Sequence, residues 1–160
     1  ELERLHEQCF SWALTCTGGR RAEAEDVLQM TYLAIVEGDA KFAGRSSLRT
    51  WLFAVIRNTA GSRWRRARRS LETLARIAAF APHAETFVEP QMPAENARVL
   101  EALRALPKRQ HEVLDLVFYR DLSIAEAAEV LGISLGTARM HYERGKAALR
   151  ERLADMGPEA

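Results

Sequence analysis

Cysteine and histidine are scarce in this chain of 160 residues, which contains two cysteines and four histidines. Cys9 and Cys16 lie seven positions apart, and on one helix their Cα atoms would be about 10 Å apart, too far for a disulfide. A structural zinc site needs four converging ligands, and the pair His6 and Cys9 has no second pair nearby in the sequence. We therefore expect two reduced thiols, no metal and no bound cofactor.

The motifs that mark many enzymes are also missing. Gly18-Gly19 and the isolated glycines lack the spacing of a phosphate-cradling loop. His111-Glu112 is not followed by the second histidine of a zinc protease, and neither cysteine has a recognisable base partner. We expect no catalytic residue and no small-molecule substrate, and so a protein that is not an enzyme.

Long apolar runs are absent as well. No stretch approaches the length that spans a bilayer, and no signal peptide is visible at the start. We therefore expect no membrane insertion and a cytoplasmic location. The hydrophobic fraction of 48% is enough for packed cores.

Strand signals are almost absent, because the chain has neither sustained alternation of apolar and polar residues nor a hairpin dipeptide. Helical periodicity instead runs over residues 2–16, 22–37, 47–67, 95–105, 108–120, 123–131 and 135–153. Prolines cluster between residues 70 and 93, where a short helix is expected only over residues 71–80. The sequence predicts an all-α fold of two small helical domains, residues 1–69 and 94–155, joined by a flexible linker, residues 70–93.

Carboxylates are missing between Asp39 and Glu72. Residues 42–69 carry eight arginines and no acid, whereas residues 1–41 carry a net charge of −4. In the predicted third helix we expect Phe53, Arg57 and Trp64 to share one outward-facing side. Arginines beside exposed aromatic rings are suited to bind a phosphate backbone and to stack on unpaired bases. A solvated helix end, with cations that complement the helix dipole, is the alternative.

Residues 123–149 have the pattern of a helix-turn-helix. Ser123 and Glu126 have the spacing of a capping box, Gly132 can adopt the left-handed conformation that ends a helix, and Ser134 can cap the next helix. An apolar stripe then consists of Ala138, Tyr142, Gly145 and Leu149. The opposite side carries Thr137, Arg139, Met140, Glu143 and Arg144. A polar-faced second helix after a glycine turn fits the major groove of DNA, although an ordinary helical hairpin shares this pattern.

The predicted second helix carries a different signal. Its core stripe consists of Ala24, Val27, Leu28, Thr31 and Ile35. The opposite face combines apolar with polar side chains: Asp26, Gln29, Met30, Leu33 and Glu37. Apolar side chains among acids and an amide are typical of a protein docking surface.

These segments together resemble a bacterial RNA polymerase sigma factor of the extracytoplasmic-function (ECF) group over nearly the whole chain. Residues 24–33, from Ala24-Glu25-Asp26 to Leu33, are similar to the segment that grips the clamp helices of the polymerase largest subunit. Residues 42–58 resemble the segment that opens and reads the −10 promoter element. Leu106-Pro107 and the helix-turn-helix are similar to the module that reads the −35 element as a duplex.

The resemblance implies a function and a set of contacts. Such a subunit binds core polymerase, through the clamp helices and the flap, and directs it to promoter DNA, and an anti-sigma factor holds it inactive by covering its binding faces. The implied polymerase-binding residues are Asp26, Gln29, Met30 and Leu33. The implied −10 residues are Phe42, Gly44, Arg45, Ser46, Ser47, Arg57, Asn58, Arg63, Trp64, Arg65 and Arg66, of which the loop 42–47 would capture a flipped base. The implied −35 residues are Ser134, Thr137, Arg139, Met140, His141 and Arg144.

The chain departs from the family pattern in two places. Met30 stands where an acid usually follows the glutamine of the polymerase-binding segment. Met140, His141 and Tyr142 replace the commoner small, basic and aliphatic residues, so the family's −35 preference does not transfer to this chain.

Two other kinds of protein share part of these features. A standalone transcription regulator would have the helix-turn-helix, but the arginine block and the docking face would have no role. An adaptor that binds only proteins would lack steep salt-dependent binding to a forked promoter fragment.

Overall fold

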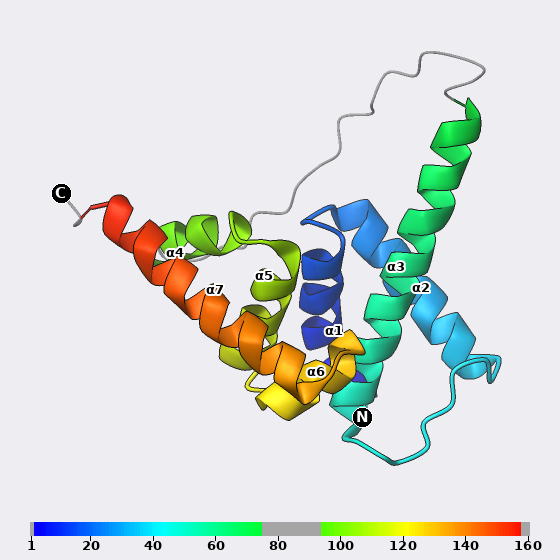
Figure 1. Cartoon of the computed structure of the whole chain (residues 1–160). Helices are drawn as coiled ribbons and strands as arrows, with labels where there is room; N and C mark the ends of the chain where they lie inside the picture. The colour runs from blue at the N-terminus through cyan, green and yellow to red at the C-terminus, as the bar shows by residue number, and fades with distance from the viewer. Residues whose placement is uncertain (1, 75–93, 158–160) are drawn as a thin grey trace. The chain divides into compact units, whose positions relative to one another are not determined.

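The computed structural model describes residues 2–74 and 94–157, which fall into two units, Glu1–Glu89 and Pro90–Ala160. Every secondary-structure element over these residues is a helix, so the predicted all-α class is confirmed. The first unit contains α1 (Leu2–Cys16), α2 (Arg21–Val36) and α3 (Leu48–Leu74). The second contains α4 (Ala94–Arg104), α5 (Lys108–Leu114), the π-helix η1 (Asp115–Tyr119), α6 (Ile124–Leu131) and α7 (Leu135–Asp155). Figure 1 shows the helices of both units and labels α1 to α7.

The three helices of the first unit pack pairwise around an aromatic centre. Trp12 of α1 is fully buried, and its indole Nε1 donates a hydrogen bond of 3.0 Å to the Phe53 carbonyl of α3. The rings of Trp12 and Phe53 lie 6.0 Å apart. The predicted exposure of Phe53 is therefore wrong. The strongly basic segment that follows Phe53 suggested an outward side, but the packing of α3 against α1 places this ring in the core.

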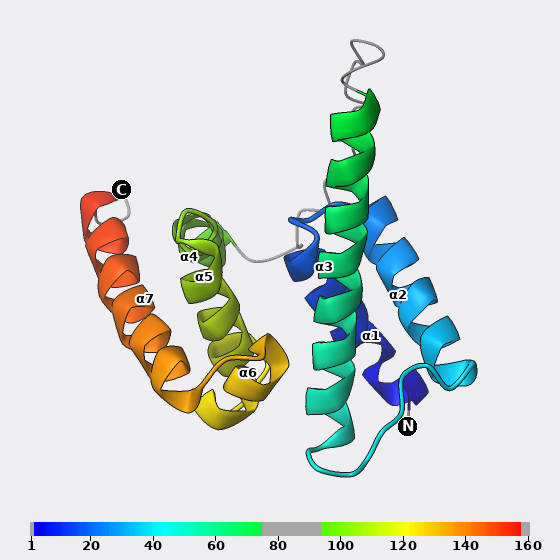
Figure 2. The same ribbon diagram turned by 45° about the vertical axis from the view of Figure 1, so that its right-hand side comes forward.

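Helix α3 is longer than its periodicity predicts. The pattern suggests an end near residue 67, whereas the helix continues to Leu74 and includes residues 70–74 of the expected linker. The remaining linker residues, 75–93, lie outside the described part of the chain. Figure 2 shows the C-terminal half of α3 projecting past α1 and α2, and side chains 64–72 are all exposed. Among the described residues of the first unit, this half projects beyond α1 and α2 and buries no apolar face against them, so the apolar periodicity stops before the helix does.

The second unit has its core between α4, α5 and α7. Leu103, Leu106 and Leu114 are buried there, and Tyr142 and Leu149 of α7 pack against them. Gly145 brings α7 close to α5, since a Cβ at this position would lie 3.1 Å from Leu114 Cδ1. The predicted helix over residues 108–120 exists as two parts, because α5 widens into the π-helix η1 after Leu114.

The helix-turn-helix starts as the sequence predicts. Ser123 and Glu126 form the capping box of α6, and Gly132 ends α6 in the left-handed conformation with φ 63°. Ser134 Oγ accepts a hydrogen bond of 3.1 Å from the Thr137 amide and so caps α7. Each of the two helices therefore begins at a side-chain cap, and the turn between them runs from the left-handed Gly132 to the Ser134 cap.

Within residues 2–74 and 94–157, no helix is both long and apolar enough to cross a membrane.

Candidate polymerase- and DNA-binding surfaces

Four predicted polymerase-binding residues lie on α2, and we call them the docking face. Asp26, Gln29 and Leu33 are exposed, and Met30 is half-buried. Leu33 leaves 51% of its surface exposed to solvent. The structure thus brings the four predicted residues together on one exposed side of α2, although Met30 contributes less surface than the sequence pattern suggests.

One ion pair joins the docking face to the predicted DNA-binding helix. Asp26 Oδ2 lies 2.8 Å from Arg63 Nη2 of α3. The two residues are separated by more than thirty positions, so no local spacing rule could have revealed this pair. A residue predicted to contact polymerase therefore neutralises a residue predicted to contact DNA.

The loop before α3 contains a second set of predicted DNA contacts. Phe42 is exposed, yet its ring lies 5.4 Å from that of Trp51, so a side chain of α3 supports it. Gly44 has φ +69°, a conformation that glycine adopts without strain. Ser47 Oγ accepts from the Thr50 amide at 3.1 Å and caps α3.

The other loop residues differ in their exposure to solvent. Arg45 is exposed and Ser46 is half-buried. Within residues 42–47, the structure therefore leaves the Phe42 ring and the Arg45 guanidinium as the large groups that an incoming base could meet.

The basic segment of α3 divides into a packed part and a projecting part. Arg57 is half-buried among the helices of the first unit, whereas Asn58 is exposed. Trp64, Arg65 and Arg66 lie on the projecting half and are all exposed. Exposed arginines on a projecting helix can approach a phosphate backbone from several sides.

Arg68 belongs to the same surface, although it is not among the predicted contacts. Its guanidinium carbon lies 5.5 Å from the centre of the Trp64 ring, and its Nε lies 3.2 Å from Glu72 Oε1. This arrangement holds a cation over one face of an exposed aromatic ring. The spacing of Trp64 and Arg68, one helical turn apart, is the sequence signal that could have identified it.

The predicted −35 contacts lie along the first turns of α7, and we call them the reading face. Arg139, Met140 and Arg144 are exposed, while Thr137 and His141 are half-buried. Ser134 is exposed, but its hydroxyl caps α7 and lies 2.8 Å from Thr137 Oγ1. Ala138 and Gly145, on the opposite side of α7, are buried. The exposed side chains can therefore enter the major groove of DNA, while the apolar stripe on the opposite side holds α7 in its unit.

Aromatic side chains that the sequence patterns did not single out lie beside α7. Phe118 and Tyr119 are exposed on η1, and the Phe118 ring stacks on Tyr142 at 5.9 Å. Lys146 Nζ lies 4.5 Å from the centre of the Tyr142 ring. The interpretation of Tyr142 as a stripe residue is correct, but its ring reaches the edge of the core.

Buried charges lie where α5 widens into η1. Asp115 and Arg120, both buried, are joined by a contact of 2.7 Å. Burial lowers the pKa of His111 below its ordinary 6.5, although Asp115 and Glu112 oppose this effect. This half-buried imidazole therefore prefers its neutral form.

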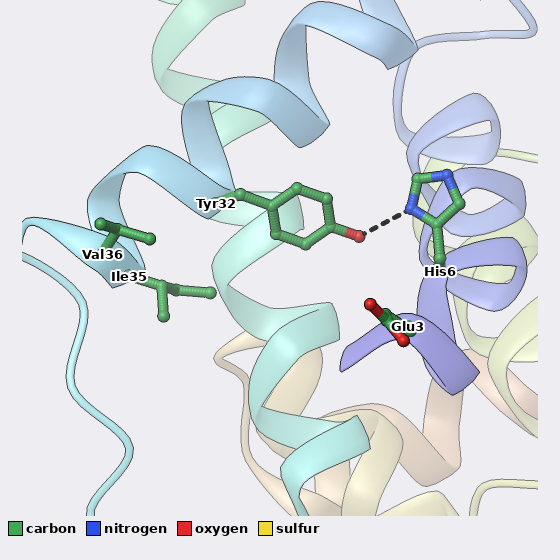
Figure 3. A pocket seen from close by; sticks show the side chains of 5 residues that line it. All are labelled: Glu3, His6, Tyr32, Ile35 and Val36. Carbon is green, nitrogen blue, oxygen red and sulfur yellow. Dashed lines mark hydrogen bonds between the residues drawn. The ribbon is translucent and has the colours of Figure 1, made fainter. Parts of the chain in front are cut away.

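A groove lies between α1 and the C-terminal end of α2. Its volume is about 520 Å³, and its lining includes Glu3, His6, Tyr32, Ile35 and Val36. Figure 3 shows Tyr32 pointing toward His6, where the hydroxyl and His6 Nδ1 lie 3.1 Å apart. Burial raises the pKa of the Tyr32 hydroxyl. No predicted docking residue lines this groove.

Two family patterns match the sequence. "Sigma-70 region 2" matches residues 2–70, and "Sigma-70, region 4" matches residues 96–149. The chain is 30% identical over 151 residues to the "ECF RNA polymerase sigma factor EcfG" of Rhodopseudomonas palustris, which covers 88% of this chain and 80% of that protein. It is 31% identical over 140 residues to the "ECF RNA polymerase sigma factor SigC" of Mycobacterium tuberculosis, with 85% and 71% covered.

Two solved structures have similar folds. The sigma factor RpoE, solved in complex with the anti-sigma factor NepR from Bartonella quintana, has a TM-score of 0.70 and 25% identity, with 96% of this chain and 94% of that chain covered. CnrH, solved in complex with the cytosolic domain of CnrY, has a TM-score of 0.61 and 26% identity, with 98% and 86% covered.

Proposed function

Since this chain belongs to the ECF group of sigma-70-type RNA polymerase sigma factors, we propose that its two units divide promoter recognition between them. The protein is an alternative sigma factor that binds core RNA polymerase and directs it to promoters with −10 and −35 elements. In our proposal the first unit docks on polymerase and opens the −10 element, and the second anchors on the −35 element. The observation that carries this proposal is the presence, in one chain, of a projecting basic helix and a capped helix-turn-helix.

The docking face of α2 would contact the clamp helices of the polymerase largest subunit. Leu33 and Met30 supply apolar surface there, and Asp26 and Gln29 supply polar groups around it. Leu33 is 51% exposed, so burying the rest of this side chain is worth about 1–1.5 kcal/mol, and it can be a main anchor of the contact. The flap of polymerase would contact the second unit.

Opening of the −10 element would use the loop 42–47 and the projecting half of α3. Extruding a base costs a few kcal/mol, which stacking and phosphate contacts must recover. Phe42 offers an exposed ring for stacking, and Asn58 and the arginines from Arg57 to Arg66 offer donors to the strand. If the six arginines from Arg57 to Arg69 each neutralised one phosphate of a single strand, log affinity would fall with log salt at a slope of about −4.

The −35 element would be read as a duplex by the reading face of α7. Arg139, Met140 and Arg144 are exposed and can meet base edges or phosphates in the major groove. His141 and Thr137, which are half-buried, would contact the groove wall. Engaging both promoter elements with one chain raises the effective concentration of each unit without new contacts.

The protein functions with partners and not as a catalyst. The similar RpoE structure contains an anti-sigma factor, and for this chain such an inhibitor holds the sigma factor inactive until a signal releases it. We propose that this chain contributes no catalytic residue and no cofactor of its own to transcription. It would work in the cytoplasm, where polymerase and promoter DNA are found.

A transcription assay with purified core polymerase tests this function. The reactions compare core alone, core with this protein, and this protein with a promoter fragment from which core is omitted. We expect RNA with a defined 5′ end only when both proteins are present. A standalone regulator would bind the duplex fragment but would give no transcript from core, and this result would reject the proposal.

A further inference from the structure

The seam between α2 and α3 holds two charged groups in fixed positions. Thr31 Oγ1 of α2 lies 3.3 Å from Thr59 Oγ1 of α3, and Thr31 is fully buried. About one turn earlier on α2 and one turn later on α3, Asp26 meets Arg63 at 2.8 Å. The two helices therefore run antiparallel along this seam, and its buried part positions both charged side chains.

The ion pair at this seam is open to partners. The side chains of Asp26 and Arg63 keep 51% and 36% of their surface exposed. Such exposed pairs contribute little net free energy, because water solvates both charges well. A cation from another protein can therefore displace Arg63 from Asp26, and a phosphate can displace Asp26 from Arg63.

We propose that Asp26 and Arg63 form an exchange site through which polymerase binding increases DNA binding. In the free protein Asp26 neutralises Arg63. When a basic group on polymerase forms an ion pair with Asp26, Arg63 is released and can contact a phosphate of the non-template strand. This inference rests on the proposed function, because it requires that the docking face of α2 binds polymerase.

Thermodynamic linkage gives the exchange a reciprocal consequence. If polymerase raises the affinity for DNA through this pair, DNA raises the affinity for polymerase by the same factor. An exposed pair supports an effect of about two- to fivefold. One additional phosphate contact with a single strand also steepens the salt slope by about 0.7.

The test removes the charge of Asp26 in the full-length protein without polymerase. The probe is a 12-nucleotide single-stranded DNA, and binding is measured by fluorescence anisotropy at several salt concentrations. We expect Asp26→Asn to tighten binding two- to fivefold and to steepen the salt slope by about 0.7. The matched control is Glu25→Gln, which removes the same charge from the next residue, where the carboxylate pairs with Arg21 at 2.8 Å within α2.

Two further comparisons isolate the pair. In an Arg63→Gln background, Asp26→Asn should give no gain beyond that of Glu25→Gln. In holoenzyme assembled at saturating core polymerase, the advantage of Asp26→Asn over Glu25→Gln on a forked promoter should disappear, because polymerase has already taken Asp26. Circular dichroism melting of each variant checks that the fold is kept.

The inference is overturned if Asp26→Asn binds the probe no more tightly than Glu25→Gln does. This includes the case in which neither variant binds the probe. It is also overturned if the gain persists without Arg63. The proposed function has a separate readout. A gain in the free protein without any transcription by holoenzyme would reject the proposed function, whereas normal transcription without the gain would reject only the exchange.

Discussion

The projecting half of α3 and the reading face of α7 hold their charges in different ways. Residues 42–69 carry eight arginines without an acid, and the described side chains from Trp64 to Glu72 are all exposed. The reading face carries Arg139, Met140 and Arg144, with Glu143 next to them, on a helix that is capped by Ser134 and packed against α5 through Gly145. An unbalanced, exposed set of charges favours affinity for any phosphate backbone, whereas a rigid helix with few charges favours the reading of base edges.

This difference predicts that substitutions on the two helices cause defects in different assays. Reversing Arg65 and Arg66 to Glu lowers the net charge of the projecting helix by four units, so it should have the largest effect. We expect promoter opening, measured by permanganate reactivity in holoenzyme, to fall at least tenfold, while the preference of the free protein for a −35 duplex over a scrambled duplex is nearly unchanged. Reversing Arg150 and Arg152, which are exposed near the end of α7, is the matched control and should leave opening intact.

Polymerase docking should depend on apolar surface more than on charge. Leu33→Asp should weaken core polymerase binding about tenfold or more, because it removes a buried apolar contact and adds a charge. Fluorescence titration with labelled core measures this affinity. The matched control is Val36→Asp, a more exposed apolar residue of α2 outside the docking face. Equal losses for both variants would contradict the assignment of the docking face.

The reading face should lose affinity for the duplex without losing the ability to melt DNA. Arg144→Ala is expected to weaken binding to a −35 duplex about five- to twentyfold, the range of one base or phosphate contact. Once holoenzyme is bound at saturating concentration, the fraction of open promoter should stay the same. Arg150→Ala on the same helix should have little effect. If Arg144→Ala and the Arg65/Arg66 reversal gave the same defect, the division between the units would be wrong.

Substitutions at two glycines of α7 test the packing of this helix without changing any side chain that is predicted to contact DNA. A Cβ at position 145 would lie 3.1 Å from Leu114, so Gly145→Ala should lower the free energy of unfolding by about 1–3 kcal/mol. At Gly136 the nearest atom to a Cβ, apart from chain neighbours, is 3.9 Å away, so Gly136→Ala should raise stability by about 0.5–1 kcal/mol. Urea unfolding of the full chain measures both. A Gly145→Ala variant as stable as Gly136→Ala would contradict the close approach of α7 to α5.

The smallest expected effect is that of His111 on the pH dependence of stability. Its pKa is lowered in the folded protein by burial, so the folded state binds fewer protons than the unfolded state near pH 6. The contribution to stability is therefore complete above the ordinary pKa of 6.5 and is lost as pH falls through the lowered pKa. Urea unfolding at pH 7.5 and 5.5 should show a smaller loss on acidification for His111→Gln than for the wild-type protein. An equal loss would show that other groups cause the pH dependence.

Local sequence rules predict most helices of this chain well, since most helix starts and ends depend on nearby residues. The capping box at Ser123 and the left-handed Gly132 are short-range features that the structure confirms. The end of α3 was not predicted, because its last turns bury nothing and so show no apolar periodicity. Phe53 was misplaced for a related reason: the arginines that follow it suggested an exposed side, and only tertiary packing against Trp12 shows its burial.

The candidate sites were predictable to different degrees. The docking face and the reading face lie along single helices, so spacing alone grouped their residues. The Asp26–Arg63 pair and the Phe118–Tyr142 stack join separate helices, and no spacing rule connects their members. Arg68 lies one helical turn after Trp64, a spacing that a local rule can detect, but its contacts with the Trp64 ring and with Glu72 are seen only in the structure.

Site-specific photo-crosslinking in holoenzyme tests the central claim most directly. A photoreactive phenylalanine analogue is placed at position 64 of α3 or at position 140 of α7, and the crosslinked nucleotides are mapped on one promoter. Our account predicts crosslinks from position 64 to the −10 region and from position 140 to the −35 region. Crosslinks from both positions to the same element, or in the reverse order, would contradict it.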